Sequence, residues 1–413
     1  MSHPLLSLSV SLAFAVSLVP VVPTANAKSR PHPDAAKSEN TKTKVERDVA
    51  VRLQIFLDRE NFGPGKIDGG YGGFTKLAWL HWQQAHGVEK PEVETLDPLA
   101  PQLATIDPLY LEYTITADDL ASLGPVASQP AEQAKLKAMS YGTLSELLGE
   151  RFHSSVDFLM KLNAPKKLDA LKVGDTLSVP NVQPPFDLAQ VGGWKSLQRA
   201  QASATKKKEQ EEKAAAGKTP TQGGNNSAAT SPAASPAPSP VANTTAAAAA
   251  SDASPSSSPV ASSGKPSAVA MPALPVLSPA AYVHISVKEC YLELRDGDKL
   301  VAAFPVTPGS STIPTPVGEW KILGKALFPE FRWDKEMLMH GKRSKDAYEL
   351  PPGPNSPVGI AWIGLNKPGI GLHGTNNPET IGRAASHGCV RLANWDAFKL
   401  YNMVEKGMKV VIE

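Results

Sequence analysis

Apolar positions near the start of the chain form one short, continuous run. Residues 5–22 are almost all Leu, Val, Ala, Ser and Phe, and the small-x-small tripeptide 25–27 precedes Lys28. This order is typical of a secretory signal peptide over residues 1–27, and an uncleaved membrane anchor is the alternative because no Lys or Arg precedes the run. Residues 28–44 are polar and basic, which predicts disorder. No later run approaches about 18 apolar residues, so we expect a soluble mature chain in an exported compartment.

From residue 45 the apolar spacing becomes helical. Val49, Leu53 and Phe56 recur at intervals of three or four, and a glycine-rich stretch follows over 63–73. A second periodic run begins at Thr75 and stops before Gly87. The pattern predicts two short helices joined by a glycine-rich loop, in a small helical domain over residues 45–100.

Residues 111–182 combine strand and helix patterns. Residues 113–116 read as a strand, 144–152 and 156–162 as two short helices, and 171–180 as a turn and a closing strand. Residues 117–138 lie between the first strand and the first helix as an insertion. The order predicts a small α+β domain.

The periodic spacing of apolar residues ends near residue 200. Residues 206–213 are a run of mixed charge, and residues 214–279 are dominated by Ala, Ser, Pro, Thr and Gly. Such a segment buries too little apolar surface to offset the entropy lost on ordering. We therefore predict a disordered linker over residues 200–279 that tethers the N-terminal domains to the rest of the chain, with a span on the order of 50 Å.

Short alternating runs return over residues 280–413. One helix interrupts them, with Asn394 as its predicted cap, Trp395, Phe398 and Tyr401 on one face, and Gly407 at its end. Many strands with one helix predict a mainly β domain. The predicted strands are 283–287, 291–294, 300–306, 319–323, 359–365, 369–372 and 409–412.

Composition narrows the function. The chain of 413 residues is long enough for about three units. Its 42 Lys and Arg against 40 Asp and Glu give a formal net charge of +2, which gives no support to a nucleic-acid partner. Two cysteines exclude a disulfide-dense scaffold.

One of those cysteines lies where reactive side chains gather. Cys389 follows Gly388 directly, and His387 and His373 precede it. The thiolate is the attacking species, and a neighbouring imidazole supplies the base that forms it. Gly388 permits a tight turn, so the N–H groups of Gly388 and Cys389 are candidates for an oxyanion hole. A buried, inert cysteine is the alternative.

This segment resembles the active-site signature of the YkuD-type L,D-transpeptidases. The matching residues are His373-Gly374-Thr375 and Ser386-His387-Gly388-Cys389-Val390-Arg391-Leu392, with further matches at 315–318 and 352–359. The resemblance covers residues 281–413. It implies a YkuD-type β-sandwich over residues 280–413, with the catalytic cysteine in a groove.

The resemblance assigns roles to the matching residues. Cys389 corresponds to the nucleophile, His373 to the proton donor and acceptor, and the Gly374 carbonyl is a candidate to orient the His373 ring. His387 is expected to shape the turn and is the alternative base. Arg391 orders the loop or meets a substrate carboxylate, and a solvated or salt-bridged arginine is equally compatible with the sequence. Ser386 is the remaining candidate site residue, because it belongs to the matching signature.

The resemblance also implies a substrate. The family acts on peptidoglycan, where a tetrapeptide stem forms a thioester with the cysteine, its terminal D-amino acid leaves, and an amine of a neighbouring stem accepts the acyl group. Water as acceptor would make a carboxypeptidase, a hydrolase, and a lipoprotein lysine would make a wall-anchoring enzyme. A catalytically inactive wall-binding scaffold is the non-enzymatic alternative. The expected location is the periplasm or cell wall of a bacterium.

Both N-terminal domains resemble wall-binding modules. Residues 111–182 resemble a LysM module in the order of their elements, apart from the insertion at 117–138 and a late Gly-Asp-Thr. Residues 45–100 resemble peptidoglycan-binding domain 1, and a small helical bundle without ligand is the alternative. The residues that carry this second resemblance are Leu53-Gln54, Phe62, Gly65, Ile67-Asp68-Gly69, Tyr71-Gly72, Thr75, Ala78 and Trp82-Gln83.

Metal binding is the rival use of the same side chains. His373, His387 and Cys389 are three possible zinc ligands, but no paired Cys-x-x-Cys or His-Glu-x-x-His pattern accompanies them. We therefore expect neither a metal nor a cofactor. Cys290 is expected in a strand, in phase with Leu292, as a buried and inert thiol, and a disulfide between Cys290 and Cys389 would abolish nucleophilicity.

Overall fold

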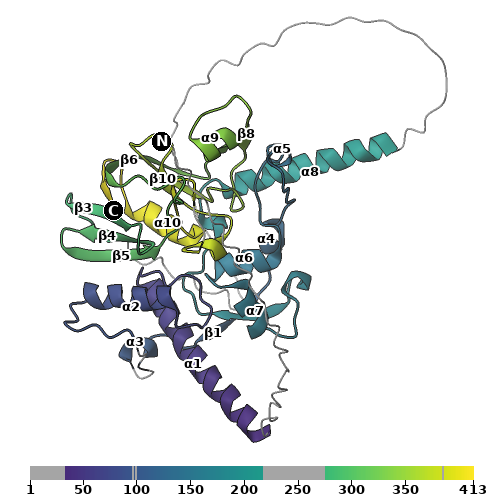
Figure 1. Ribbon diagram of the computed structural model, residues 1–413. Helices are drawn as coiled ribbons and strands as arrows, with labels where there is room; N and C mark the ends of the chain where they lie inside the picture. Colours follow the sequence, from purple (N-terminus) through teal and green to yellow (C-terminus); the bar gives the residue numbers. More distant parts are fainter. Residues whose placement is uncertain (1–32, 95–96, 98–99, 217–274, 384–385) are drawn as a thin grey trace, which may run out of the picture. The chain divides into compact units, whose positions relative to one another are not determined.

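The computed structural model describes residues 33–94, 97, 100–216, 275–383 and 386–413 (Figure 1). The predicted signal peptide and most of the predicted linker lie outside the described residues. The chain forms two compact units, residues 1–46 and residues 47–413. Of the first unit the structure describes only the beginning of helix α1, Pro33–Arg59. Residues 33–44 are therefore helical where the sequence predicts disorder.

Two helices and a glycine-rich loop form the start of the second unit, as predicted. Helix α1 is followed by α2, Gly73–Ala85, and the short α3, Pro101–Ala104. The buried Gln54 holds the loop between α1 and α2: its Nε2 donates to Asp68 Oδ1 at 2.9 Å and to the Gly70 carbonyl at 3.1 Å. Its Oε1 accepts from the Gly69 amide at 3.0 Å. These three bonds, and a fourth from the Asp68 amide to the same oxygen, replace regular secondary structure in the loop.

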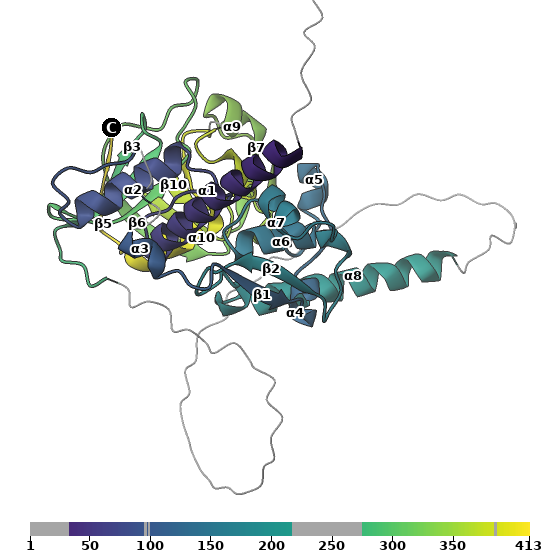
Figure 2. The ribbon, with the colours of Figure 1, turned by 90° about the horizontal axis from the view of Figure 1, so that it is seen from below.

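The next region has the predicted order of strand, two helices and strand. Strand β1, Tyr110–Thr114, pairs antiparallel with β2, Thr176–Pro180, and the two lie side by side in Figure 2. Asn163, after the second helix, bonds both backbone groups of Ser178 on β2, at 2.7 and 2.8 Å. The helices of this region are α4 (Ala117–Ala121) and α5 (Pro130–Gln133) in the insertion, then α6 (Leu144–Arg151), α7 (Val156–Leu162) and the 3-10 turn η1 (Leu168–Ala170).

Helix also replaces the start of the predicted linker. After the 3-10 turn η2, Leu188–Gln190, helix α8 runs over Trp194–Ala216. Trp194 at its first turn is buried and stacks on Phe328 at 5.6 Å between ring centroids. Residues 200–216 therefore continue a helix whose first residue, Trp194, is packed against Phe328. The composition of residues 200–216 does not reveal this contact.

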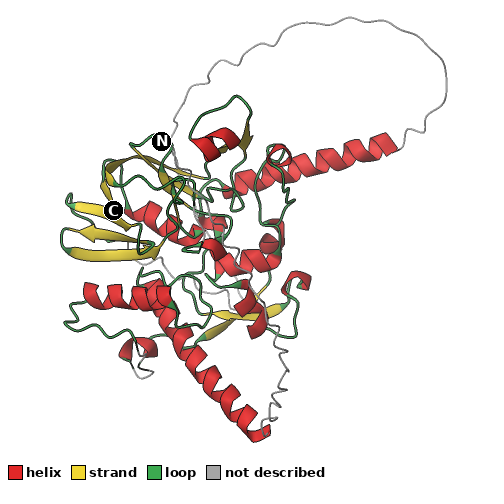
Figure 3. Cartoon of the chain, viewed as in Figure 1, coloured by secondary structure: helices red, strands yellow, loops and turns green. Residues whose placement is uncertain are grey.

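Strands dominate the chain after residue 275 (Figure 3). The structure has one eight-stranded sheet, in the order β11-β10-β9-β6-β12-β3-β4-β5, where the resemblance implies a β-sandwich. The ten-residue strand β6 pairs with β12 along its first half and with β9 along its second half, and the register shifts between Ile322 and Gly324. This shift bends the strand, so one curled sheet surrounds its own core. The strands are β3 (Ala281–Ser286), β4 (Tyr291–Asp296), β5 (Lys299–Pro305), β6 (Gly318–Leu327), β9 (Ala361–Leu365), β10 (Gly371–His373), β11 (Val390–Arg391) and β12 (Lys409–Ile412).

Five further elements complete this part. The predicted helix is α10, Asn394–Met403, but its cap position is Ala393, and the Asn394 side chain is used elsewhere. A small hairpin of β7 (Phe331–Asp334) and β8 (Ala347–Leu350) encloses α9 (Lys335–His340), and η3 (Pro378–Thr380) precedes the cysteine loop. No described helix combines the length and the apolar character needed to cross a membrane.

The N-terminal region contacts the sheet directly. Residues 61–63 extend the edge strand β5: the Gly63 amide donates to the Ala303 carbonyl at 2.7 Å, and the Ala303 amide donates to Asn61 at 3.0 Å. The buried Tyr291 hydroxyl donates to the Gly63 carbonyl at 2.6 Å. The two parts therefore share a core, whereas the predicted tether would leave them free to separate.

A buried ion cluster joins the same two parts. Asp58 on α1 bonds Lys399 on α10 at 2.8 Å and His153 at 3.0 Å. Burial raises the pKa of Asp58, but its interactions with His153 and Lys399 outweigh this effect and hold the pKa far below its usual range. The His153 ring also stacks on Trp395, with centroids 5.0 Å apart.

Candidate active site

The sheet brings His373 and Cys389 to one face. Strands β10 and β11 are parallel, with His373 opposite Arg391 and Leu372 opposite Val390. Side chains alternate along a strand, and paired residues point to the same side. Cys389 directly precedes β11 and thus lies on the side of the sheet that carries His373 and Arg391.

The His373 ring is fixed on two sides. Its Nδ1 lies 2.6 Å from the Gly374 carbonyl, and the ring stacks on Trp362 with centroids 5.4 Å apart. A carbonyl only accepts hydrogen bonds, so Nδ1 carries the proton and Nε2 keeps its lone pair. Burial, with a smaller contribution from the charge of Arg391, lowers the pKa of His373 to about 4. The imidazole is therefore neutral at pH 7 and available as a base.

The Cys389 thiol is also neutral at rest. Its Sγ donates to the Gly369 carbonyl at 3.4 Å. Burial raises the pKa of the thiol, while the Gly371 amide and the Arg391 charge act in the opposite direction. The site therefore holds a thiol and a neutral imidazole, and the attacking thiolate has to form by proton transfer during the reaction.

The turn before Cys389 is held by backbone contacts. The Ser386 amide donates to the Pro308 carbonyl at 2.9 Å, and the Ser386 hydroxyl donates to the Cys389 carbonyl. Gly388 has φ +97°, in the region that glycine adopts without strain. Among the described residues, neither the Gly388 amide nor the Cys389 amide donates to a backbone oxygen outside the regular helices and strands. His387 is exposed at this turn.

Arg391 joins the cysteine loop to the neighbouring segment. Its amide and carbonyl pair with the backbone of Thr307 at 3.0 and 2.8 Å. The half-buried guanidinium is close enough to Cys389 and His373 to lower the pKa of both groups. Its effect on the site is thus electrostatic as well as structural.

Gly374 occupies a place that admits no side chain. A Cβ at this position would overlap the Oδ1 of Asn394, and a Cβ at Gly359 would overlap the same atom. Asn394 is fully buried and its Oδ1 accepts from the Ile360 amide at 3.2 Å. The close approach fixes the backbone whose carbonyl holds the His373 ring.

The structure differs from the prediction at Cys290. This residue lies in the turn before β4 with φ +55°, partly exposed, and its Sγ points to the Val287 carbonyl at 3.7 Å. It is therefore outside the strand in which it was expected. Both cysteines are free thiols.

The sequence pattern selects seven site residues, of which six are buried or half-buried around the ends of β10 and β11, whereas His387 is exposed; the six are His373, Gly374, Ser386, Gly388, Cys389 and Arg391. It missed Trp362, whose strand was predicted, because the pattern shows only that this residue is apolar, not what it stacks on. It also assigned Asn394 to a helix cap. Within the described ranges, no three His, Cys, Asp or Glu side chains form a metal-binding group.

A family comparison identifies this part of the chain. Residues 280–412 match the YkuD family, the L,D-transpeptidase catalytic domain. Curated relatives align over stretches of similar length. YkuD of Bacillus licheniformis is 32% identical over 130 residues, which are 32% of this chain and 64% of the relative. YkuD of Bacillus subtilis is 28% identical over 146 residues, 35% of this chain and 74% of the relative.

The match therefore spans less than two thirds of the first of these relatives and about one third of the present chain. Among solved structures, L,D-transpeptidase 3 from Mycobacterium tuberculosis aligns with 20% identity and a TM-score of 0.27, over 33% of this chain and 62% of that chain. The N-terminal region, residues 33–216 of the described chain, lies outside the match to the YkuD family.

Proposed function

We propose that the chain is an exported L,D-transpeptidase acting on peptidoglycan stem peptides. The observation that carries the proposal is the placement of Cys389 on the sheet face of His373, whose Nδ1 proton is bound by the Gly374 carbonyl. This arrangement leaves Nε2 as the only basic nitrogen of a neutral imidazole beside a protonated thiol. The YkuD match of residues 280–412 supports the substrate class.

The reaction begins with acylation of the enzyme. His373 Nε2 takes the thiol proton as Cys389 Sγ attacks the carbonyl carbon of the L,D peptide bond. The oxyanion of the tetrahedral intermediate is bound by the amides of Gly388 and Cys389. The C–N bond then breaks, His373 returns its proton to the leaving amine, and a thioester and a free D-amino acid result.

The second half transfers the acyl group. The amine of a neighbouring stem attacks the thioester carbon, His373 accepts a proton from that amine, and the thiolate leaves and is protonated again. The product is a new amide bond and a regenerated thiol. Arg391 supplies a positive charge beside both reacting groups, and Ser386 holds the carbonyl of Cys389 and hence the turn. Wall binding by the regions 45–100 and 111–182 is part of the proposal, as a means of concentrating the enzyme on its polymer.

Intact mass measurement tests the thioester. The full chain is incubated with a tetrapeptide muropeptide, and Cys389→Ser and Cys290→Ser serve as matched variants. We expect an adduct that lacks the mass of one D-amino acid on the unaltered chain and on Cys290→Ser, and none on Cys389→Ser. Absence of any adduct, with wall binding intact, would establish a non-catalytic scaffold instead.

Muropeptide analysis of the same mixtures identifies the acceptor. Cross-linked dimers support transpeptidation. Shortened tripeptides without dimers would assign hydrolysis, and attachment of a lysine-bearing lipoprotein would assign protein anchoring. Either of these results would replace the cross-linking function while keeping the thioester chemistry.

A further inference from the structure

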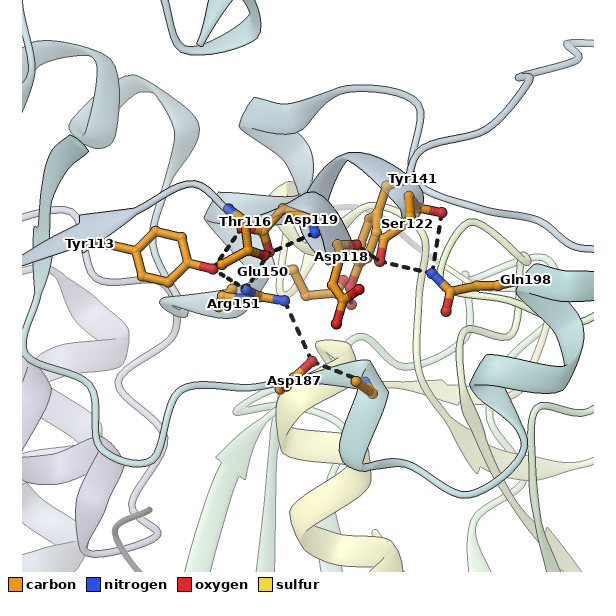
Figure 4. A network of polar contacts seen from close by, with 12 residues as sticks. Tyr113, Thr116, Asp118, Asp119, Ser122, Tyr141, Glu150, Arg151, Asp187 and Gln198 are labelled. Carbon is orange, nitrogen blue, oxygen red and sulfur yellow. Dashed lines mark hydrogen bonds and ion pairs between the residues drawn. The ribbon is translucent and has the colours of Figure 1, made fainter. Parts of the chain in front are cut away.

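A buried carboxyl outside the YkuD domain is bonded to the active-site framework. Glu150 lies on α6 and is 6% exposed. Its Oε1 accepts from the Tyr141 hydroxyl at 2.6 Å, and its Oε2 accepts from Asn394 Nδ2 at 2.9 Å. Figure 4 shows Glu150 and Tyr141 beside the polar network of the N-terminal region. Glu150 and Asn394 are 244 positions apart in the chain.

Helix α6 is itself held firmly. Arg151, the residue after Glu150, pairs with Asp119 and with Asp187, the latter at 3.4 Å (Figure 4). Arg151 also donates to the Tyr113 hydroxyl. Because the carboxylates and the phenol come from different segments, Arg151 fixes α6 to three other parts of residues 113–187. Glu150 thus presents its carboxyl from a rigid support.

Asn394 transmits this position to the catalytic base. Its Nδ2 donates to Glu150 and, at 3.3 Å, to the Pro354 carbonyl, and these two bonds set the rotation of the amide. The same amide places Oδ1 against Gly374, where a Cβ would overlap it. The Gly374 carbonyl in turn accepts the Nδ1 proton of His373. A turn of the Asn394 side chain would therefore move the group that orients the base.

We propose that Glu150 is a positioning residue for His373, acting through Asn394 and the Gly374 backbone. The inference rests on the proposed transpeptidase function, in which His373 is the base. It assigns the N-terminal region a part in catalysis besides any binding to the wall. Displacement of a catalytic group by about 1 Å typically costs on the order of 100-fold in rate, so a small rotation is sufficient to be measured.

Three variants at position 150 and one at position 146 isolate the bond. Glu150→Met keeps the volume and removes the bonds to Asn394 and to the Tyr141 hydroxyl. Glu150→Gln retains an oxygen for Asn394 Nδ2 and serves as the conservative rescue. Glu150→Asp is a milder shortening that covers the case in which Glu150→Met does not fold. Glu146→Met is the matched control, because Glu146 lies one turn earlier on α6 and its carboxyl binds the Gly142 amide at 2.8 Å instead of Asn394.

Turnover and the imidazole are both measured on the full chain. Steady-state kinetics on a tetrapeptide stem give kcat and KM, and nitrogen NMR of the histidines gives the tautomer of His373, assigned by comparison with His373→Gln. We expect Glu150→Met to lower kcat roughly 10- to 100-fold with KM unchanged and to reduce the Nδ1–H tautomer. Glu150→Gln should restore both, Glu150→Asp should give a smaller loss, and Glu146→Met should leave both unchanged.

Each other outcome counts against the proposal. An unchanged kcat in Glu150→Met or Glu150→Asp, an equal loss in Glu146→Met, or a loss of kcat with an unaltered His373 tautomer would each overturn it. An unaltered chain without any turnover or Cys389 adduct would refute the proposed function instead. The two failures are therefore distinguishable.

Discussion

The buried carboxyl of Asp396 makes the stability of the protein depend on pH. The carboxyl lies in the first turn of α10, is 1% exposed, and has no hydrogen-bond partner for either oxygen among the described residues. Burial raises its pKa from 3.8 to about 8. Between pH 4 and 8 the folded chain therefore still binds a proton that the unfolded chain has already released. The free energy of unfolding falls as pH rises through this window.

The size of the effect follows from the same two values. A rise of the pKa from 3.8 to about 8 makes the ionised form less stable in the folded chain by about 6 kcal/mol. This is an upper limit, since the protein relaxes around the charge and water penetrates. Asp396→Asn replaces the carboxyl by a neutral group of the same shape. We expect a small stability difference near pH 4 and a gain of several kcal/mol at pH 9.

Urea denaturation between pH 4 and 9 measures this difference. The free energies of unfolding of Asp396→Asn and of the unaltered chain are compared at each pH. Asp346→Asn, at an exposed aspartate, is the matched control for the loss of one carboxyl group. A pH-independent difference for Asp396→Asn would refute the assignment of a raised pKa to this carboxyl.

Three further outcomes are expected. Because burial lowers the pKa of His373 to about 4, acylation of Cys389 should increase with pH through about 4 as the imidazole becomes neutral, and a rate profile with its acid limb near pH 6.5 would contradict this. Gly374→Ala should overlap Asn394 and cost about 1–3 kcal/mol in unfolding free energy together with most of the activity, as urea titration and turnover assays would reveal. Residues 275–413 alone should aggregate or lose native circular dichroism, because the β5 edge and Tyr291 become exposed, whereas a folded, fully active fragment would restore the tethered arrangement.

The sequence predicted elements where one residue pattern decides the structure. Strand β3 alternates buried and half-buried residues from Ala281 to Ser286, so its period is visible without tertiary context. The β7–β8 hairpin was missed because each of its strands has only four residues, which is too short for an alternating pattern to stand out from the surrounding sequence. Cys290 was misplaced because its left-handed conformation depends on the turn in which it lies.

The site divides in the same way. His373, Gly374 and Cys389 were found because the reacting groups have to be particular residue types in a particular order. Glu150 gave no such signal, since a glutamate on a predicted helix usually faces solvent and its partner is distant in the chain. The packing of the N-terminal region against the sheet was missed for the same reason. An Ala- and Pro-rich segment predicts a flexible connection, and its composition carries no information about contacts between the regions that it joins.

The pairing of residues 61–63 with β5 has a consequence for folding. Gly63 and Tyr291 are 228 positions apart, and Asp58 and Lys399 are 341 apart, so the finished core closes very long loops. Proteins with such distant contacts fold slowly, and in the partly folded state their unpaired strand edges can pair with other chains. Here the ribosome makes the covering segment before the strand that it covers. A newly formed β5 therefore meets a partner that is already present on its own chain, and the interval in which a second molecule can add to that edge is short.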